Sequence, residues 1–477
     1  MTKQFYFAAI LMLAANIAIA APEHSSTLKD QQEVAVTIYN DDLALVKDTR
    51  KVKLSSGEDR LAWRDVSAQI RPQTVLLRNL THSKGFSLIE QNFDFDLLTP
   101  QKLLEKYVGQ NVTVLRTHPT TGADMREDAT VLATNNGVVL KYEDRIETGV
   151  PGRLSFKGVP DNLRDRPTLV ISLDAEQSAE DTLELSYLTG GLGWSADYVA
   201  ELSKNDDRMD LNGWVTLSNT SGASYQNAKL QLVAGEVNRV RLKQGIVDAA
   251  PVLAEISKRN RTADMAEEGL FEYHLYTLNH PTTIAENQSK QVALMSVTGI
   301  PVKKEFLLSG ADYYYGSSYG DIGQKMKVSV FVEFENKDGG LGIPLPKGVV
   351  RMYKKDSQGN AQFVGEDNIS HTPRNEKVRL KLGDAFDVTA DKKQTSFKKI
   401  AGASRYNYVL EEAFEMVLKN AKDVPVTVKV MEPIPAHWEM LSESHKHKKE
   451  ASNTAVWMVD VPANGKAKLE YKVQVRY

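Results

Sequence analysis

The sequence predicts a mainly β protein. We expect small N-terminal β domains followed by antiparallel β-sandwich domains of immunoglobulin or fibronectin texture, with few short helices. Apolar and polar residues alternate over short segments through most of the chain, which is the period of half-buried strands. Turn residues separate these segments, the strands lengthen from residue 169 onward, and a comparable set recurs after residue 327. This spacing is typical of antiparallel sandwiches.

Residues 1–20 predict a secretory signal peptide. Lys3 precedes an apolar run over residues 5–15, and Ala-Ile-Ala at residues 18–20 offers a small-residue cleavage site. The run is shorter than the roughly 20 residues that a membrane-spanning helix needs. No later segment has a comparable run, so we expect an exported chain with no transmembrane segment after cleavage.

The amino-acid composition limits the kinds of site and the kinds of partner that the protein can have. The 477 residues include no cysteine, which excludes disulfides, thiolate metal sites and a cysteine nucleophile. The formal net charge is −3, and charges of both signs are well mixed along the chain. A basic stripe for nucleic acid is therefore missing, and we expect no nucleic-acid partner.

The N-terminal half is expected to hold two small β domains. Residues 21–32 are polar and without periodicity, which predicts a flexible leader. Alternating residues on both sides of Asn40 then predict a hairpin in a first β domain over residues 33–98. Thr99 and the proline after it suit a helix start. Residues 99–160 therefore predict a short spacer helix plus a small five-stranded barrel or open sheet.

The remaining chain is expected to form sandwiches. Residues 165–246 predict a first β-sandwich segment, and residues 270–477 predict a C-terminal β-sandwich region. Residues 247–269 break the strand pattern with alanine and mixed charge, which predicts a surface insertion. Three strands end on an asparagine before a turn, and we expect this residue to serve the same turn chemistry each time. These residues are Asn219, Asn336 and Asn420.

The loop at residues 316–320 matches G-x-S-x-G, the nucleophile-elbow pattern of serine hydrolases, with Ser318 as its serine. That pattern requires a strand before the serine and a helix after it. Here the sequence continues into a predicted strand at residues 327–335. Ser318 is the candidate nucleophile of a periplasmic hydrolase, and a glycine-rich loop between two strands is the alternative.

Tyrosines near this loop are candidate contacts for a sugar or a peptide, because aromatic rings with polar tips suit such surfaces. We expect at least one of them to be buried and at least one exposed. The candidates are Tyr313, Tyr314, Tyr315 and Tyr319. His445 and His447 are the only closely spaced histidines. A metal site needs three or four ligands, so we expect a solvated loop there, no metal and no cofactor.

Residues 344–388 gather six carboxylates and a histidine, but their register disperses this cluster. A β-turn at residues 372–375 predicts that the flanking segments form a hairpin, with Ile369 opposite Val378. In this register Asp367 lies among apolar residues, and it is a candidate ligand-binding acid. Buried polar groups regularly find partners, so the alternative is a hydrogen bond to backbone amides or to an arginine.

Two segments carry a family resemblance: YLTGGLGWSADYVAEL at residues 187–202 and PLPKGVVRMYKKDSQGNAQFVGEDNISHTPRNEKVRLKLGDAFDV at residues 344–388. The chain from about Val34 to the C-terminus resembles a family of exported bacterial proteins known as a domain of unknown function. It is distantly similar to the mucoidy-inhibitor A proteins. The resemblance implies a Gram-negative envelope, periplasmic or secreted protein of mainly β structure, and it supplies no catalytic residues.

Our preferred hypothesis is an exported, non-enzymatic binding or interaction module whose partner is an envelope protein or a polysaccharide. A serine-dependent hydrolase using the loop at residues 316–320 is one alternative. An outer-membrane-associated protein is another, because residues 469–477 alternate up to a terminal aromatic residue. Barrels in that membrane need such alternation throughout, and we expect a sandwich edge strand at this position instead.

Overall fold

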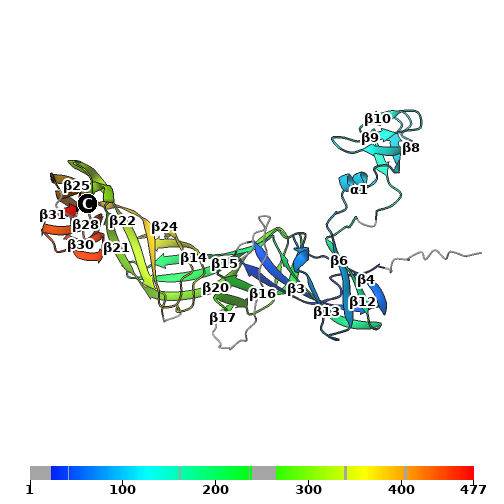
Figure 1. The fold of residues 1–477 in the computed structure, drawn as a ribbon, viewed down its shortest axis with the longest axis horizontal. Helices are drawn as coiled ribbons and strands as arrows, with labels where there is room; N and C mark the ends of the chain where they lie inside the picture. The colour runs from blue at the N-terminus through cyan, green and yellow to red at the C-terminus, as the bar shows by residue number, and fades with distance from the viewer. Residues whose placement is uncertain are drawn as a thin grey trace, which may run out of the picture.

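A computed structural model describes residues 23–40, 42–160, 163–235, 237–238, 265–337, 341–401 and 406–477. It confirms the mainly β class: 66% of the chain is strand, in five mostly antiparallel sheets, none of them closed. The predicted signal peptide and most of the predicted insertion at residues 247–269 lie outside the described residues. The ribbon is elongated, with the C-terminus at one end and a small domain standing apart near the other (Figure 1).

The N-terminal sandwich consists of two sheets around Trp63 and other fully buried side chains. In spatial order, the first sheet contains β1 (Glu23–Ser26), β4 (Gly57–Arg64), β12 (Thr168–Ala175) and β6 (Phe86–Asp94). The second contains β17 (Met265–Leu270), β18 (Tyr273–Leu278), β16 (Tyr225–Ala234), β2 (Gln31–Tyr39), β3 (Leu43–Leu54), β13 (Ala179–Thr189) and β5 (Leu76–Asn79), with β19 (Thr282–Ile284) beside β16.

This sandwich differs from the expected first domain. The predicted flexible leader supplies a strand, because β1 pairs in parallel with β4. The first domain does not close at residue 98: β12 returns to pair with β4 and β6, and β16 pairs in parallel with β2. Sequence patterns reveal strands but not their partners, and here the partners lie more than a hundred residues away.

The small domain is inserted between β6 and β12. It contains α1 (Pro100–Lys106), β7 (Asn111–Thr117), β8 (Asp124–Ala133), β9 (Val139–Lys141), β10 (Ile146–Thr148) and β11 (Arg153–Ser155). The Thr99 hydroxyl accepts a hydrogen bond from the Lys102 amide at 3.1 Å, so the predicted helix start is confirmed. The five strands form an open sheet, and Leu104 and Tyr107 pack into its core. The helix is therefore part of this domain rather than a spacer.

A middle sheet packs on the N-terminal sandwich and shares its core. Its strands, in spatial order, are β20 (Gln288–Pro301), β15 (Arg208–Asn219), β14 (Leu192–Leu202), β23 (Gly348–Lys355) and β24 (Ala361–Ile369). The described helices are all too short or too polar to cross a lipid bilayer.

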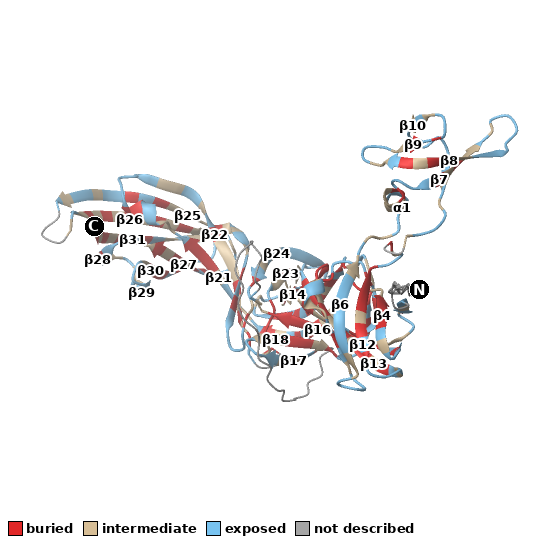
Figure 2. Cartoon of the chain, turned by 45° about the vertical axis from the view of Figure 1, so that its right-hand side comes forward, coloured by how far each residue is buried: buried red, intermediate tan, exposed pale blue. Residues whose placement is uncertain are grey.

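The C-terminal sheet has nine strands. They are β28 (His437–Glu443), β31 (Gly465–Arg476), β26 (Tyr408–Asn420), β25 (Lys377–Ala401), β22 (Asp321–Glu335), β21 (Lys303–Ser309), β27 (Val426–Pro433), β30 (Thr454–Val461) and β29 (Lys448–Ala451). The sheet bends around a second core that contains Phe414, Val428 and Trp457. Figure 2 shows buried residues along β26, β31 and β27, whereas β28 and β29 are mostly exposed.

The predicted hairpin across residues 372–375 is wrong. Its first arm, β24, pairs with β23 in the middle sheet, whereas its second arm, β25, pairs with β22 in the C-terminal sheet. The two arms still pack closely where the sheets diverge. A Cβ atom on Gly365 would lie 2.3 Å from the carbonyl oxygen of Leu382, so glycine is required for this approach.

The turn role expected of the three asparagines is confirmed. All three side chains are buried, and each amide nitrogen donates to a carbonyl oxygen beyond the strand that it ends. The pairs are Asn219–Ala223 at 2.8 Å, Asn336–Ile343 at 2.8 Å and Asn420–Val424 at 2.9 Å. Each amide oxygen also accepts a backbone N–H. One buried side chain thus pairs with both a donor and an acceptor of the backbone in its turn.

Candidate functional site

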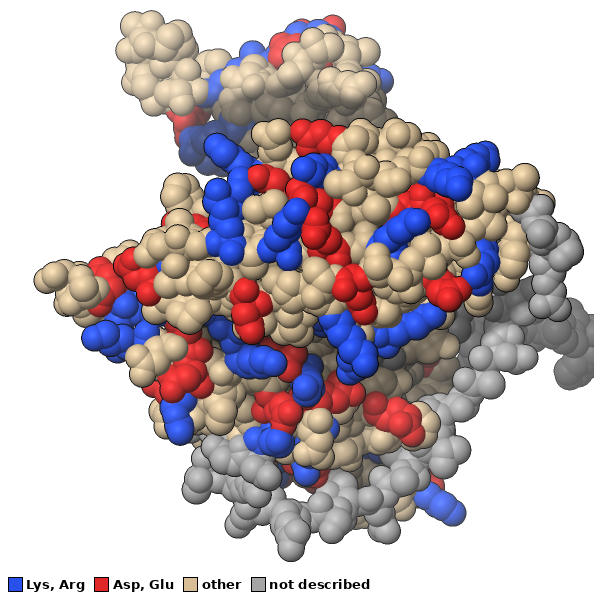
Figure 3. Space-filling view, turned by 90° about the vertical axis from the view of Figure 1, so that its left-hand side faces the viewer, with Lys and Arg blue, Asp and Glu red and all other residues tan. Residues whose placement is uncertain are grey.

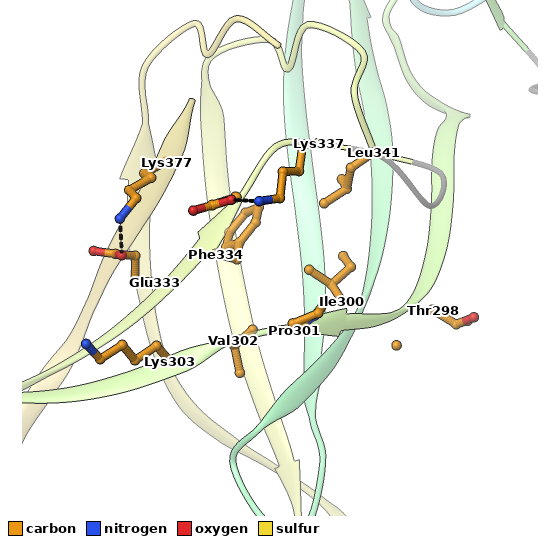
Figure 4. A pocket seen from close by; sticks show the side chains of 12 residues that line it. Thr298, Ile300, Pro301, Val302, Lys303, Glu333, Phe334, Lys337, Leu341 and Lys377 are labelled. Atoms are coloured by element: carbon orange, nitrogen blue, oxygen red, sulfur yellow. Dashed lines mark hydrogen bonds and ion pairs between the residues drawn. The ribbon is translucent and has the colours of Figure 1, made fainter. Parts of the chain in front are cut away.

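A groove of about 770 Å³ lies at the waist of the molecule, where β20 of the middle sheet passes into β21 of the C-terminal sheet (Figure 4). Gly299 has a φ of +71°, and the register of β20 against β15 shifts before this end of the strand. Pro301 has no N–H. The backbone N–H of Val302 donates to the carbonyl oxygen of Asp207 at 2.9 Å. Local backbone chemistry thus turns the chain from one sheet into the next.

The groove is apolar inside and charged at its rim. Its lining consists of Thr298, Gly299, Ile300, Pro301, Val302, Lys303, Glu333, Phe334, Glu335, Lys337, Leu341 and Lys377. Ile300, Phe334 and Leu341 are buried and form the floor, whereas Thr298 is exposed.

Ion pairs occupy the rim. Lys377 lies 3.2 Å from Glu333, and Lys337 pairs with Glu335 (Figure 4). Lys303 forms no ion pair with any described residue. Binding sites of this volume are usually apolar with a few polar groups, and they often lie where two structural units meet.

The predicted tyrosines separate into a buried and an exposed pair. Tyr314 and Tyr315 point into the C-terminal core, whereas Tyr313 and Tyr319 are 60% and 43% exposed. The exposed rings lie side by side, with centroids 6.1 Å apart. Residues 312–315 form a short 3-10 helix, and the helical geometry turns Tyr313 outward while Tyr314 and Tyr315 face the core. Tyr313 and Tyr319 remain candidate contacts for a sugar or a peptide, but they do not line the groove.

Ser318 lies exposed in a loop that leads directly into β22, so no helix follows it. The loop is held by Gln394, whose side-chain oxygen accepts from the Tyr319 amide at 2.9 Å. The side-chain nitrogen of Gln394 donates to the Ser317 carbonyl at 3.1 Å. Among the described residues, the Ser318 hydroxyl has no hydrogen-bonded base. The strand-to-helix context of a nucleophile elbow is missing.

Asp367 is satisfied by backbone amides, as one of the two alternatives expected. Its carboxylate accepts from the Asn368 amide at 2.8 Å and from the Lys381 amide at 2.7 Å. The side chain is partly exposed, because the hairpin that would have buried it does not form. Asp367 therefore bridges the two arms where their sheets diverge.

The two neighbouring histidines have separate partners. His445 contacts Ser444 at 3.0 Å, and His447 contacts Glu443 at 2.9 Å. Over the part of the chain that the structure describes, no three histidine, aspartate or glutamate side chains gather as a metal site would require. Figure 3 shows Lys and Arg intermingled with Asp and Glu on one end of the molecule, without a patch of a single sign.

Sequence reasoning missed both the groove and a pair of charged residues in the C-terminal core. Lys392 and Glu432 are almost completely buried there. A signal for Lys392 was present, because alternation along β25 places it on the same side as Val388 and Ala390, which are fully buried. The groove lies where two sheets meet, and the local sequence pattern does not predict such a junction.

Comparison with known proteins shows the family. No curated protein matches the chain significantly. A family model described as a domain of unknown function, DUF4139, matches residues 183–477, which include the whole groove and both segments that carry the resemblance. Since this match covers more than half of the chain, the protein belongs to the DUF4139 family.

Proposed function

We propose that this protein is exported to the Gram-negative cell envelope and acts as a non-enzymatic interaction module. In this proposal the waist groove holds an extended segment of a partner protein. The single observation that carries it is the groove itself, with its apolar floor and charged rim between two sheets. Export rests on the signal-peptide pattern of residues 1–20, and the same proposal includes a distant relation to mucoidy-inhibitor A proteins.

The lining favours a polypeptide over a polysaccharide. Phe334 is the only aromatic residue among the groove residues, and it is buried in the floor. Sugar rings are usually held by exposed aromatic faces with polar tips, and the groove offers none. Apolar side chains of a peptide can instead cover Ile300 and Leu341. Lys303 is free to meet a carboxylate of the partner.

A photo-crosslinking amino acid at Thr298 tests the proposal in the producing bacterium. Thr298 lines the groove and is exposed, whereas Val424 is an exposed apolar residue in the loop between β26 and β27 and does not line it. We expect a discrete protein adduct from position 298 and none from position 424. Equal adducts from both positions, or an adduct with a polysaccharide alone, would overturn the proposed occupant.

A matched pair of substitutions tests affinity for the captured partner. Thr298→Arg places a long cation at the groove, and Val424→Arg places the same group away from it. We expect Thr298→Arg to weaken binding at least tenfold, since about 1.4 kcal/mol is enough for that change. Val424→Arg should leave binding as in the unmodified protein. Titration of the purified partner by calorimetry measures both.

A further inference from the structure

Two oppositely charged side chains meet inside the C-terminal core. The amine nitrogen of Lys392 on β25 lies 2.8 Å from Oε2 of Glu432 on β27, and both side chains are 1% exposed. The two strands are not neighbours, because β22 and β21 stand between them in the sheet. The contact therefore crosses the interior of the bent sheet.

Aromatic rings surround the amine. Its nitrogen lies 4.3 to 6.0 Å from four ring centroids, and among the described residues Glu432 is its one hydrogen-bond partner. The rings belong to Tyr314, Tyr315, Phe414 and Tyr471. An ammonium group has three donors and loses its hydration here. Burial lowers the pKa of Lys392, which favours the neutral and nucleophilic amine.

The carboxyl group of Glu432 is held on one side only. Oε2 also accepts from the Tyr315 hydroxyl at 2.8 Å, whereas buried Oε1 has no partner among the described residues. A Cβ atom on Gly310 would lie 2.2 Å from Oε2, so the backbone leaves room for the carboxyl group only because this residue is glycine.

In a second buried ion pair of the same chain, between Asp48 and Arg50, both carboxylate oxygens have hydrogen-bond partners. In the N-terminal sandwich, Asp48 Oδ2 accepts from Arg50 and Trp63, and Oδ1 accepts from Gln31 at 2.8 Å. Both oxygens are thus satisfied. The Lys392 pair lacks this completeness, and an incompletely bonded buried ion pair is costly.

We propose that Lys392 and Glu432 condense spontaneously in the folded protein into an intramolecular amide bond that links β25 to β27. A proton passes from the Lys392 ammonium group to Oε2 of Glu432, and the resulting amine attacks Cδ. The Nζ–Cδ bond forms, a Cδ–O bond breaks, and one water leaves with the carboxyl hydroxyl and one amine proton. The reaction is a redox-neutral dehydration, so it needs no oxidant, reductant or co-reactant.

Neighbouring hydroxyl groups suit this step. The Tyr315 hydroxyl donates to the carboxyl oxygen and polarises Cδ for attack, and it lies 2.9 Å from the Tyr471 hydroxyl, which extends the path for a proton. Glu412 is a buried carboxyl group in the same core, and burial raises its pKa to about 8. It therefore stays largely protonated at neutral pH and adds no third charge to this core. Tyr315 acts as a catalytic residue in this reaction, because its hydroxyl group contacts the reacting carboxyl group of Glu432.

Condensation also suits the energetics of the site and the composition of the chain. It removes two buried charges whose desolvation is costly. Two reacting groups held in contact have effective concentrations of about 10⁵ M or more, which compensates for the unfavourable loss of water. The chain has no cysteine, so an amide cross-link is a covalent staple that does not depend on redox conditions.

Peptide mapping of the purified full-length protein decides the question. After denaturation and trypsin digestion, we expect peptide 382–393 joined to peptide 430–446, lighter than their sum by one water. The intact protein should also be lighter by one water than the mass calculated for the same purified polypeptide chain. Recovery of peptide 430–446 in linear form with no joined product would overturn the proposal. A lost water located elsewhere in the chain would overturn it as well.

Adjacent lysines provide the matched control. Lys392→Arg keeps the charge but removes the nucleophile, whereas Lys393 is 55% exposed and pairs with Glu415, so Lys393→Arg leaves the core unchanged. We expect linear peptides from Lys392→Arg and the joined product from Lys393→Arg. Tyr315→Phe should fold and leave a measurable unlinked fraction. If Lys392→Arg does not fold, the map of the unmodified protein still decides.

Discussion

Arg50 Nη2 lies 2.7 Å from Asp48 Oδ2, and the Arg50 side chain is completely buried between the sheets of the N-terminal sandwich. The guanidinium group also donates to the carbonyl oxygens of Ser26 and Arg64, and it lies 4.6 Å from the centroid of the Trp63 ring. This one side chain therefore ties β3 to β1 and β4 in the facing sheet.

Replacement of Arg50 by methionine should destabilise the protein by about 3–5 kcal/mol, because it leaves the Asp48 carboxylate buried without its counter-charge. The same change at Arg60 should cost less than about 1 kcal/mol. Arg60 pairs with Glu23 at 3.4 Å, but its side chain is 42% exposed. Urea unfolding of both variants measures the difference, and equal losses would contradict the role given to Arg50.

Asn336→Ala should cost about 1–3 kcal/mol, because it removes a buried side chain and leaves the carbonyl of Ile343 and the amide of Gly342 without this partner. Asn360→Ala is the control, since Asn360 lies exposed in a turn and contacts Asp356 at 3.5 Å. Chemical denaturation at one pH compares the two. A loss at Asn336 no larger than that at Asn360 would argue against a structural role for the amide.

Stability of the C-terminal core should decrease with rising pH because of Glu412. Burial raises its pKa from the ordinary 4.5 to about 8. The folded state then binds a proton that the unfolded chain releases above pH 4.5. This contribution to the free energy of unfolding is complete below pH 4.5 and is lost as the pH rises to about 8.

Glu412→Gln should remove this part of the pH dependence, since glutamine has no proton to lose. Thermal unfolding at pH 5 and pH 8, followed by tryptophan fluorescence, compares the variant with the unmodified protein. Exposed Glu470 supplies the control substitution Glu470→Gln, which should retain the dependence. An unchanged pH profile in Glu412→Gln would assign the effect to another group.

Gly365→Ala should destabilise the junction of the middle and C-terminal sheets. Both Gly365 and Gly359 have positive φ, but only the Cβ at residue 365 would collide with the backbone of Leu382. The excess cost over Gly359→Ala should be about 1–3 kcal/mol, as for other overpacked sites. Equilibrium unfolding of the two variants checks this, and equal costs would mean that the junction relaxes freely.

Capping and turn interactions were predictable from the sequence, whereas the pairing of strands was not. Thr99 caps its helix and the three strand-ending asparagines bond in their turns as expected, because these interactions span only a few residues. A turn does lie between β24 and β25, but at residues 374–375, one residue later than expected. The expected cross-strand pairs fail because a β-turn between two strands does not require them to share a sheet.

Burial of polar residues was harder to predict for the same reason. The alternating pattern of β25 places Lys392 inward, but a lysine beside Lys393 in a charged segment resembles a solvated edge. Its acidic partner lies 40 residues later on a strand that is not its neighbour. The groove at Ile300 and Phe334 likewise depends on how two sheets diverge, which no local period encodes.

The long-range pairing of β2 with β16 and of β3 with β13 constrains the order of folding. The strands β2 and β3 leave the ribosome early. Their partners β16 and β13 come much later in the chain, and the family match begins within β13, at residue 183. Contacts of such high sequence separation form slowly. The hairpin of β2 and β3 therefore keeps its two outer edges unpaired until most of the first half of the chain has been made.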